Sequence, residues 1–220
     1  DDPRLATFAA LRRRGITPEA IKSLIIEVGP KTSDVTLSWE NLYAYNRKII
    51  DPVANRYFFV HNPRELFVKK IPHPFVAKFP LHPDQPKKGF RPFKIEPKES
   101  KASFLISSND TDLVKTGKKI RLMGLLNFQV EKIGKHLIEA SFHSESHDEA
   151  KKLGAPLIHW IPVGTGFPCE VVMHDASVAE GMAEDSCREL HPDDIIQFER
   201  FGFVRVDRLN KKLTAYFAHR

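Results

Sequence analysis

The sequence predicts a mainly β protein with a helical subdomain at its N-terminus, and two features of the chain support this. Over residues 1–52, apolar side chains recur at helical spacing between capping residues. From Arg56 onward, short aromatic and β-branched segments follow one another, with Pro, Gly, Asn or Asp between most of them. Many short strands at irregular spacing favour small closed barrels over a parallel α/β sheet.

The first predicted helix ends in three consecutive arginines. Leu5, Phe8 and Leu11 lie at helical spacing, and Gly15 stands where a left-handed cap would close the helix. Positive charges in the last turn complement the partial negative charge of a helix end, so a solvated helix terminus is the simplest interpretation of residues 12–14. That interpretation explains one arginine better than three.

Two further short helices are predicted before residue 53. Thr17, followed by a proline and a glutamate, is an N-cap signal, and this helix is expected to stop at Gly29. Ser38 begins the third helix, which is expected to end at Asp51. The apolar faces are predicted to be Ile21, Leu24, Ile25 and Val28 in the second helix and Leu42, Tyr45 and Ile49 in the third.

The remainder of the chain is predicted to be strands. The segments share aromatic or β-branched residues and turn residues at their ends. They are 57–60, 66–68, 75–76, 104–106, 120–122, 137–138, 157–161, 170–173, 201–206 and 213–217.

Residues 72–97 are rich in proline and lysine and cannot form a long helix or a central strand. The stretch is either an ordered extended crossing or a linker. Phe75, Phe79, Phe90 and Phe93 favour an ordered crossing, because a flexible linker has little use for four phenylalanines.

Composition limits the partners and the compartment. A net charge of +6 makes a polyanion a natural partner, since Lys and Arg that neutralise phosphates release counterions. No apolar window is long enough for a membrane span, and two cysteines are too few for a disulfide framework. We therefore expect a cytoplasmic protein in a reducing compartment, with no membrane partner.

No self-contained catalytic or metal site is predicted. His143 and His147 stand four apart and could hold a metal on a helix, but no cysteine or further histidine is close, which favours a solvated polar loop. Cys169, Glu170 and His174 could form a nucleophile set, but in one strand Glu170 and His174 would point away from Cys169. A small hydrolase or metal enzyme remains an alternative.

Positive or amide side chains recur beside aromatic rings, which is typical of single-stranded RNA binding. Unpaired bases stack on such rings, and their edges bond to Arg, Asn and Gln. The alternative is that the rings are core and the polar groups are their solvated neighbours. The segments are 55–58, 89–93, 197–201 and Arg205.

Five ordered motifs resemble the C-terminal part of the archaeal- and eukaryotic-type glutamyl- and glutaminyl-tRNA synthetases, a class I family. They are DDPRLATFAALRRRGITPEAI, DPVANRYFFV, HPDQPKKGFRPF, LIHWIPVGTGFPCEVVMHD and IIQFERFGFVRVD, and they span essentially the full length. Within the family, SWENLYAYNRKIIDPVANRYFFV resembles the glutamyl branch.

The resemblance implies a helical connector and two β-barrels, the second inserted into the first. The expected domains are the connector at 1–52, the proximal anticodon-binding barrel at 53–75 and 159–220, and the distal barrel at 76–158. The partner implied is tRNA(Glu), with tRNA(Gln) as an open alternative, and not DNA. The catalytic half, which uses ATP and magnesium, would lie outside this chain, so we expect no catalytic residue, metal or cofactor in it and no activation of glutamate.

The family's anticodon contacts carry over residue by residue. Arg56 matches an arginine that reads the middle anticodon base, and Gln197 matches a glutamine that shares it. Arg200 is expected to neighbour a phosphate or base. Arg121 lies on the strand that faces the first anticodon base in the glutaminyl relatives. Asn55, in segment 55–58, is a further expected RNA-binding residue.

Arg12, Arg13 and Arg14 would contact phosphates along the inner side of the tRNA. Leu113 and Met123 stand where glutaminyl relatives have arginines for the outer anticodon positions, so the reading of those letters does not transfer. The other open interpretations are a glutaminyl-tRNA synthetase fragment and a stand-alone RNA-binding β-barrel module.

Overall fold

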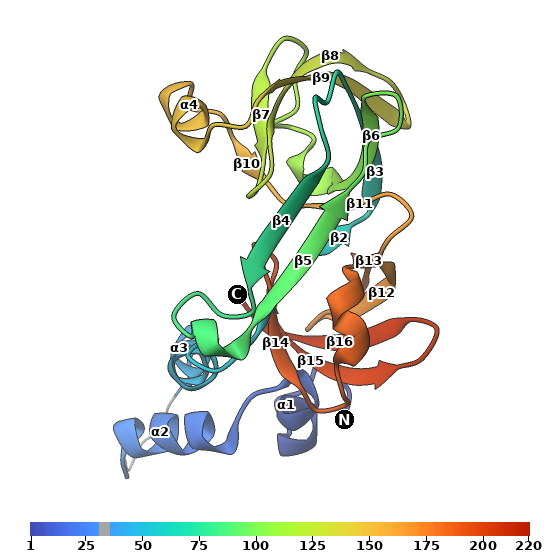
Figure 1. Cartoon of the computed structure of the whole chain (residues 1–220). Helices are drawn as coiled ribbons and strands as arrows, with labels where there is room; N and C mark the ends of the chain where they lie inside the picture. Colours follow the sequence, from blue (N-terminus) through green and yellow to red (C-terminus); the bar gives the residue numbers. More distant parts are fainter. Residues whose placement is uncertain (31–35) are drawn as a thin grey trace.

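The computed structural model describes residues 1–30 and 36–220, and it shows a helical subdomain beside two curled β-sheets (Figure 1). The predicted mainly β fold with N-terminal helices is therefore confirmed. The N-terminal helices are α1 (Phe8–Arg14), α2 (Pro18–Val28) and α3 (Trp39–Ile50).

The helix ends follow the predicted capping residues. The hydroxyls of Thr17 and Ser38 accept backbone N–H bonds at the starts of α2 and α3, and Gly15 closes α1 with φ 87°. The predicted apolar face of the first helix is only partly buried. Leu11 is in the core, but Leu5 precedes the helix and Phe8 is 74% exposed.

The seven strands of sheet A are ordered β1-β14-β15-β16-β12-β13-β2. They are β1 (Arg56–Tyr57), β2 (Phe59–His61), β12 (Phe167–Val172), β13 (Val178–Ala183), β14 (Ile195–Phe198), β15 (Gly202–Leu209) and β16 (Leu213–His219). The 3-10 turn η3 (Asp185–Glu189) follows β13.

The seven strands of sheet B are ordered β10-β7-β8-β9-β3-β6-β11. They are β3 (Pro63–Lys69), β6 (Lys101–Ser107), β7 (Lys119–Leu122), β8 (Asn127–Ile133), β9 (Leu137–Ser144), β10 (Leu157–Ile158) and β11 (Trp160–Pro162). The 3-10 turn η2 (Ser108–Asp110) follows β6, and helix α4 (His147–Lys152) follows β9.

Strand order shows why both sheets curl into barrels. In sheet A, β1 and β2 lie at opposite ends of the order but are separated in sequence by Phe58 alone. In sheet B, β10 and β11 are at opposite ends and are separated by His159 alone. A single residue cannot span a flat seven-stranded sheet, since neighbouring strands lie about 4.8 Å apart, so each sheet must bend until its edges approach.

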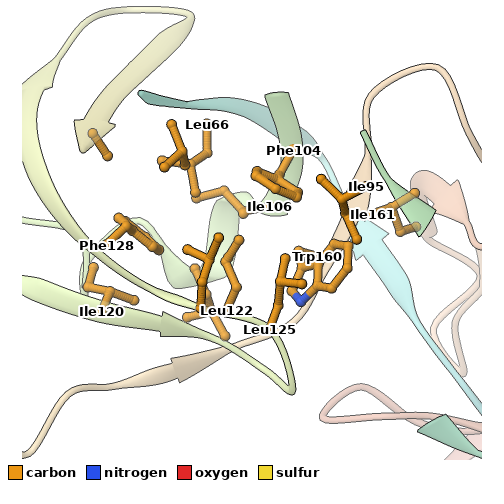
Figure 2. Packing of buried hydrophobic residues seen from close by; sticks show 14 of the residues in the cluster. Leu66, Ile95, Phe104, Ile106, Ile120, Leu122, Leu125, Phe128, Trp160 and Ile161 are labelled. Carbon is orange, nitrogen blue, oxygen red and sulfur yellow. The ribbon is translucent and has the colours of Figure 1, made fainter. Parts of the chain in front are cut away.

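Each barrel has its own apolar core. Figure 2 shows the core of sheet B, where Trp160 packs among aliphatic and aromatic side chains from several strands. The indole Nε1 of Trp160 donates to the carbonyl of Met123 at 2.9 Å, so its polar atom is satisfied inside the core. A second core, in sheet A, includes Phe59, Phe198 and Val204. The helices pack on the outside of sheet A through Leu11, Phe203 and Ala218, among others.

The residues at which the chain passes between sheet A and sheet B differ from the expected domain limits. It passes from sheet A to sheet B between β2 and β3, and it returns only after β11. The expected distal segment, 76–158, therefore leaves out β3 and β11, which belong to sheet B. The difference arises because β2 and β3 are separated by one residue, Asn62, with no composition change to mark the passage.

The proline- and lysine-rich stretch forms an ordered two-stranded ribbon, as the phenylalanines suggested. Strands β4 (Phe75–Pro80) and β5 (Phe90–Ile95) pair antiparallel, and the 3-10 turn η1 (Pro86–Lys88) lies between them. Figure 1 shows the ribbon running from sheet B toward the end of α3. The ribbon pairs with neither sheet in the strand order, which is how it accommodates its prolines. No helix in the described ranges combines the length and the apolarity that crossing a bilayer requires.

Candidate nucleic-acid interface

Arg56 and Gln197, far apart in the sequence, are register partners on adjacent strands. Parallel strands β1 and β14 place the two Cα atoms opposite each other. The N–H of Gln197 donates to the carbonyl of Asn55 at 2.9 Å. Because side chains alternate along a strand and Tyr57 and Phe198 point into the core, Arg56 and Gln197 share the outer face of sheet A.

The guanidinium of Arg56 is only partly used within the protein. Its Nη2 lies 3.3 Å from Oδ1 of Asp51, and its side chain is 28% exposed. Its Nε is buried and has no hydrogen-bond partner among the described residues. An ion pair open to water is weak, so Arg56 could exchange Asp51 for a base or phosphate at little cost.

Asn55 is held by the loop that joins the ribbon strands. Its side-chain oxygen accepts from Nζ of Lys88 at 3.1 Å, and the same Nζ also donates to the carbonyl of Val53. Gln85 donates to the carbonyl of Pro52 from the same loop. The segment before β1 is thus fixed by polar contacts from η1 and its flank. Apart from the place of Lys88 in HPDQPKKGFRPF, no pattern in the sequence predicts this role.

Arg200 is committed to an internal ion pair. Its two Nη atoms lie 2.9 and 2.6 Å from the carboxylate oxygens of Asp110, in η2 next to sheet B. Its side chain is 37% exposed, so one edge remains open. Arg200 therefore joins the loop after β14 to the second barrel, and a contact with RNA stays a prediction.

A buried charge cluster lies on the inner side of the candidate interface. Arg91 donates to Glu184 and Glu199, and Arg91 and Glu184 are each 1% exposed. Oε2 of Glu184 also accepts the N–H of Phe58 at 2.6 Å. Burial raises the pKa of Glu184 to about 7, although the neighbouring guanidinium acts in the opposite direction. The sequence predicts RNA binding for segment 89–93, and for Arg91 this prediction is wrong, because its guanidinium is enclosed by protein.

Arg121 does not face solvent as its expected role requires. Its Nη1 donates to Oδ1 of Asn127 at 2.9 Å and to the carbonyl of Glu145 at 3.0 Å, and the residue is buried in sheet B. Burial lowers the pKa of Arg121. In this conformation Arg121 supports the connection to α4 instead of facing an anticodon base.

The three arginines of α1 have three different environments. Arg14 is buried and donates to the carbonyls of Phe217 and Ala218 at 3.2 and 2.8 Å, and to the hydroxyl of Tyr43 at 2.8 Å. The expectation of a solvated or phosphate-binding group is therefore wrong for Arg14, because strand β16 ends beside the helix and its carbonyls take the guanidinium.

Arg13 and Arg12 are more accessible. Arg13 pairs with Asp1 at 2.5 Å and lies 3.7 Å from Asp207, with its Cζ 4.5 Å from the ring centre of Tyr216. Arg12 is exposed and has no ion pair among the described residues. Of the three, Arg12 is the exposed arginine that a phosphate could reach without breaking an ion pair within the described ranges.

The groups of the alternative enzyme site are dispersed. His143 lies on β9 and His147 begins α4, so they do not share a helix face, and Nε2 of His143 pairs with Glu149 at 2.9 Å. Within residues 1–30 and 36–220 no three His, Cys, Asp or Glu side chains gather as a metal site would require. Burial raises the pKa of the Cys169 thiol, which makes it a poor nucleophile.

Comparison with known families fits this geometry. Two family models, both described as the anticodon-binding domain of class I tRNA synthetases (E and Q), match residues 54–145 and 157–207. Together they cover strands of both barrels and the ribbon. The chain belongs to the anticodon-binding domains of the class I glutamyl- and glutaminyl-tRNA synthetase family.

Curated relatives point to the glutamyl branch. The whole chain is 47% identical over 224 residues to a glutamate–tRNA ligase of Pyrococcus abyssi, 42% over 221 residues to one of Methanocaldococcus jannaschii, and 40% over 220 residues to one of Methanopyrus kandleri. The chain spans about 38% of the length of each of these relatives. The chain is thus similar to one portion of an archaeal type of synthetase.

Proposed function

We propose that this chain is the anticodon-binding region of a glutamate–tRNA ligase and that it binds tRNA(Glu). One observation carries the proposal: Arg56 and Gln197 meet in register on the outer face of one barrel. A guanidinium supplies only donors, whereas a carboxamide supplies a donor and an acceptor. Together they can bond the edge of one unpaired base.

The recognition proposed is direct hydrogen bonding to a splayed-out base. Single-stranded loops expose base edges that a duplex would hide, and proteins read them with side-chain donors and acceptors. The side chain of Arg56 is 28% exposed and its ion pair with Asp51 is open to water, and Gln197 is partly exposed beside it. The basic surface of a chain with net charge +6 would add a sequence-independent, salt-dependent attraction to phosphates.

The chemistry of the complete ligase is assigned to the part of the relatives that this chain does not span. In that assignment the other part binds ATP and magnesium and attaches glutamate to the tRNA. This chain contributes recognition of the anticodon and is inactive by itself. Mixing the chain with tRNA(Glu), glutamate, ATP and magnesium should produce no glutamyl-tRNA.

A nuclease footprint of this chain on tRNA(Glu) tests the proposal directly. Protection should centre on the anticodon loop, with weaker protection along the inner side of the tRNA near Arg12. A tRNA(Glu) transcript whose anticodon loop is replaced by a stable tetraloop is the matched control, and it should lose the central protection. A footprint confined to the acceptor stem, or identical on both RNAs, would overturn the proposal.

Binding of tRNA(Gln) is the second candidate activity. Leu113 is partly exposed and Met123 packs at the edge of the sheet B core, so neither supplies the charge that the glutaminyl branch is expected to use at the outer anticodon positions. A site without those contacts would accept both tRNAs. Filter binding with the two transcripts decides this, and a tenfold or greater difference, about 1.4 kcal/mol, would exclude relaxed recognition.

A further inference from the structure

The outer face of the β4–β5 ribbon combines an exposed aromatic ring with positive charge. Side chains alternate along both strands, so one face packs inward and the other is exposed to solvent. On the buried face Arg91 and Phe93 contact the protein interior. The exposed face consists of Val76, Lys78, Phe90, Pro92 and Lys94.

Phe90 is unusual among the strand aromatics. Phe90 is 58% exposed, and within the described ranges it is the one Phe, Trp or Tyr on a strand that is exposed. The other phenylalanines of the ribbon pack against the core: Phe75 and Phe93 are buried, and Phe79 is partly buried. An exposed aromatic face is the group on which an unpaired base stacks, whatever its sequence.

Strands β1 and β5 share a contact on their inner sides, next to Arg56 and Phe90. The guanidinium of Arg91 sits 5.9 Å from the ring centre of Tyr57, on the inner side of both strands. Arg56 immediately precedes Tyr57, and Phe90 immediately precedes Arg91. Because consecutive side chains of a strand point in opposite directions, Arg56 and Phe90 both point away from the shared inner contact.

Backbone hydrogen bonds connect the end of the ribbon directly to β1, the strand of Arg56. The N–H of Arg56 donates to the carbonyl of Leu81 at 2.7 Å, and the N–H of Leu81 donates to the carbonyl of Gly89 at 3.0 Å. Backbone segments bonded in this way lie about 4.8 Å apart, so two spacings separate Arg56 from Gly89, roughly 10 Å in total. Gly89 immediately precedes Phe90. A nucleotide adjacent to a base held at Arg56 can therefore reach the ring.

The two lysines on this face are available for phosphates. Lys78 and Lys94 are exposed, and neither forms an ion pair with any residue in the described ranges. They lie farther along the ribbon than Phe90, in the direction of sheet B, at register positions opposite Pro92 and Val76. The charge favours an anion, and the ring favours a planar group, so the surface fits a single-stranded nucleic acid.

Building on the anticodon-binding function proposed above, we propose that Phe90 is a stacking platform for the unpaired base next to the one held by Arg56 and Gln197. On the same ribbon face, Lys78 and Lys94 bind the phosphates that follow. The ribbon then acts as part of the RNA-binding surface and guides the RNA strand from the barrel of sheet A toward the barrel of sheet B.

The test uses an anticodon stem-loop of tRNA(Glu) with 2-aminopurine on either side of the middle anticodon base. Stacking on a ring quenches 2-aminopurine, so the unmodified chain should change its emission at one of the two positions. Phe90→Ala and Phe90→Leu should abolish that change and weaken binding about fivefold or more, whereas Phe90→Tyr should stay within about twofold of the original chain. Val178→Ala, another exposed apolar side chain, is the matched control and should alter neither readout.

The lysines are tested by salt dependence. Lys78→Ala and Lys94→Ala should each reduce the slope of log affinity against log salt by about 0.7, the value for one phosphate of a single strand. Lys135→Ala, at an exposed turn of sheet B, should leave the slope unchanged.

The outcomes separate this inference from the proposed function. If the unmodified chain fails to bind the stem-loop, the proposed function fails and takes the inference with it. If the chain binds, Arg56→Ala weakens binding and Phe90→Ala does not, the inference alone is overturned. Equal binding by Phe90→Leu and Phe90→Tyr would also overturn it, because the ring would then serve only as apolar surface.

Discussion

Phe58 and His159, the single residues at which the two barrels close, lie with their ring centres 5.7 Å apart. Nε2 of His159 donates to the carbonyl of Phe59 at 2.7 Å, which ties the closing residue of sheet B to the edge strand of sheet A. Burial lowers the pKa of His159, so it is held as the neutral imidazole. The junction of the two barrels is therefore one packed unit, and its stability can be examined through its charged members.

Replacing Arg91 with methionine should destabilise the chain strongly. Arg91 is the cation between Glu184 and Glu199, and above pH 7, where Glu184 is ionised, its removal leaves a buried carboxylate without a partner. Breaking a buried ion pair from one side costs about 3–5 kcal/mol, and this should be seen as a lower urea midpoint. The double variant Arg91→Met with Glu184→Gln should recover part of the loss. If the double variant is no more stable than Arg91→Met alone, the unpaired charge is not the cause.

Glu184 should make the free energy of unfolding depend on pH near neutrality. Its pKa is about 7 in the folded chain, above the ordinary value of 4.5, so the folded state holds a proton that the unfolded state has released between these limits. This contribution to stability is complete below about pH 4.5 and is lost as the pH rises through 7.

The Glu184→Gln variant isolates that effect from other titrating groups. Glutamine keeps the shape and a hydrogen-bonding oxygen but cannot ionise. Urea unfolding of both proteins at pH 5 and pH 8 should show the stability of the original chain falling relative to the variant as the pH increases. A difference between the two proteins that stays constant across this range would contradict the prediction.

Arg12 and Arg14 should respond in opposite ways to substitution by alanine. Arg14→Ala removes a buried charged donor from the carbonyls of Phe217 and Ala218, and we expect a loss of about 2–3 kcal/mol in the free energy of unfolding. Arg12→Ala should leave stability unchanged and lower the salt dependence of tRNA binding. Urea unfolding and binding at several salt concentrations measure the two effects. A change in the salt slope for a folded Arg14→Ala protein, with none for Arg12→Ala, would reverse the assignment.

Helix ends could be predicted from the sequence, whereas the burial of Arg14 and Arg121 could not. Capping residues such as Thr17 and Ser38 act within one turn, so local pattern locates the helices correctly. The burial of Arg14 depends instead on β16, at the other end of the chain, and no local signal announces it. The same applies to Arg121, whose partner Asn127 lies across a strand pair that the sequence does not specify.

The candidate interface was predictable only through resemblance. Composition and spacing do not predict that Arg56 and Gln197 are neighbours, because the parallel pairing of β1 with β14 depends on the closure of the whole barrel. The phenylalanines predicted that the ribbon is ordered. The exposure of Phe90 follows from the pairing of β4 with β5, which the prolines of this stretch made difficult to predict.

The decisive prediction concerns base-specific recognition. Arg56→Ala and Gln197→Ala should each weaken binding of tRNA(Glu) by about 1–3 kcal/mol, because each removes hydrogen bonds to one base edge. Against a transcript with the middle anticodon base changed, the same substitutions should cost much less, since those bonds are already lost. Affinities of each variant for the two transcripts form a double-mutant cycle whose coupling energy reports the contact itself. Lys135→Ala provides the control for nonspecific loss of charge. Uniform weakening on both transcripts would mean that Arg56 contacts a phosphate, and it would remove the basis for anticodon reading at this pair of residues.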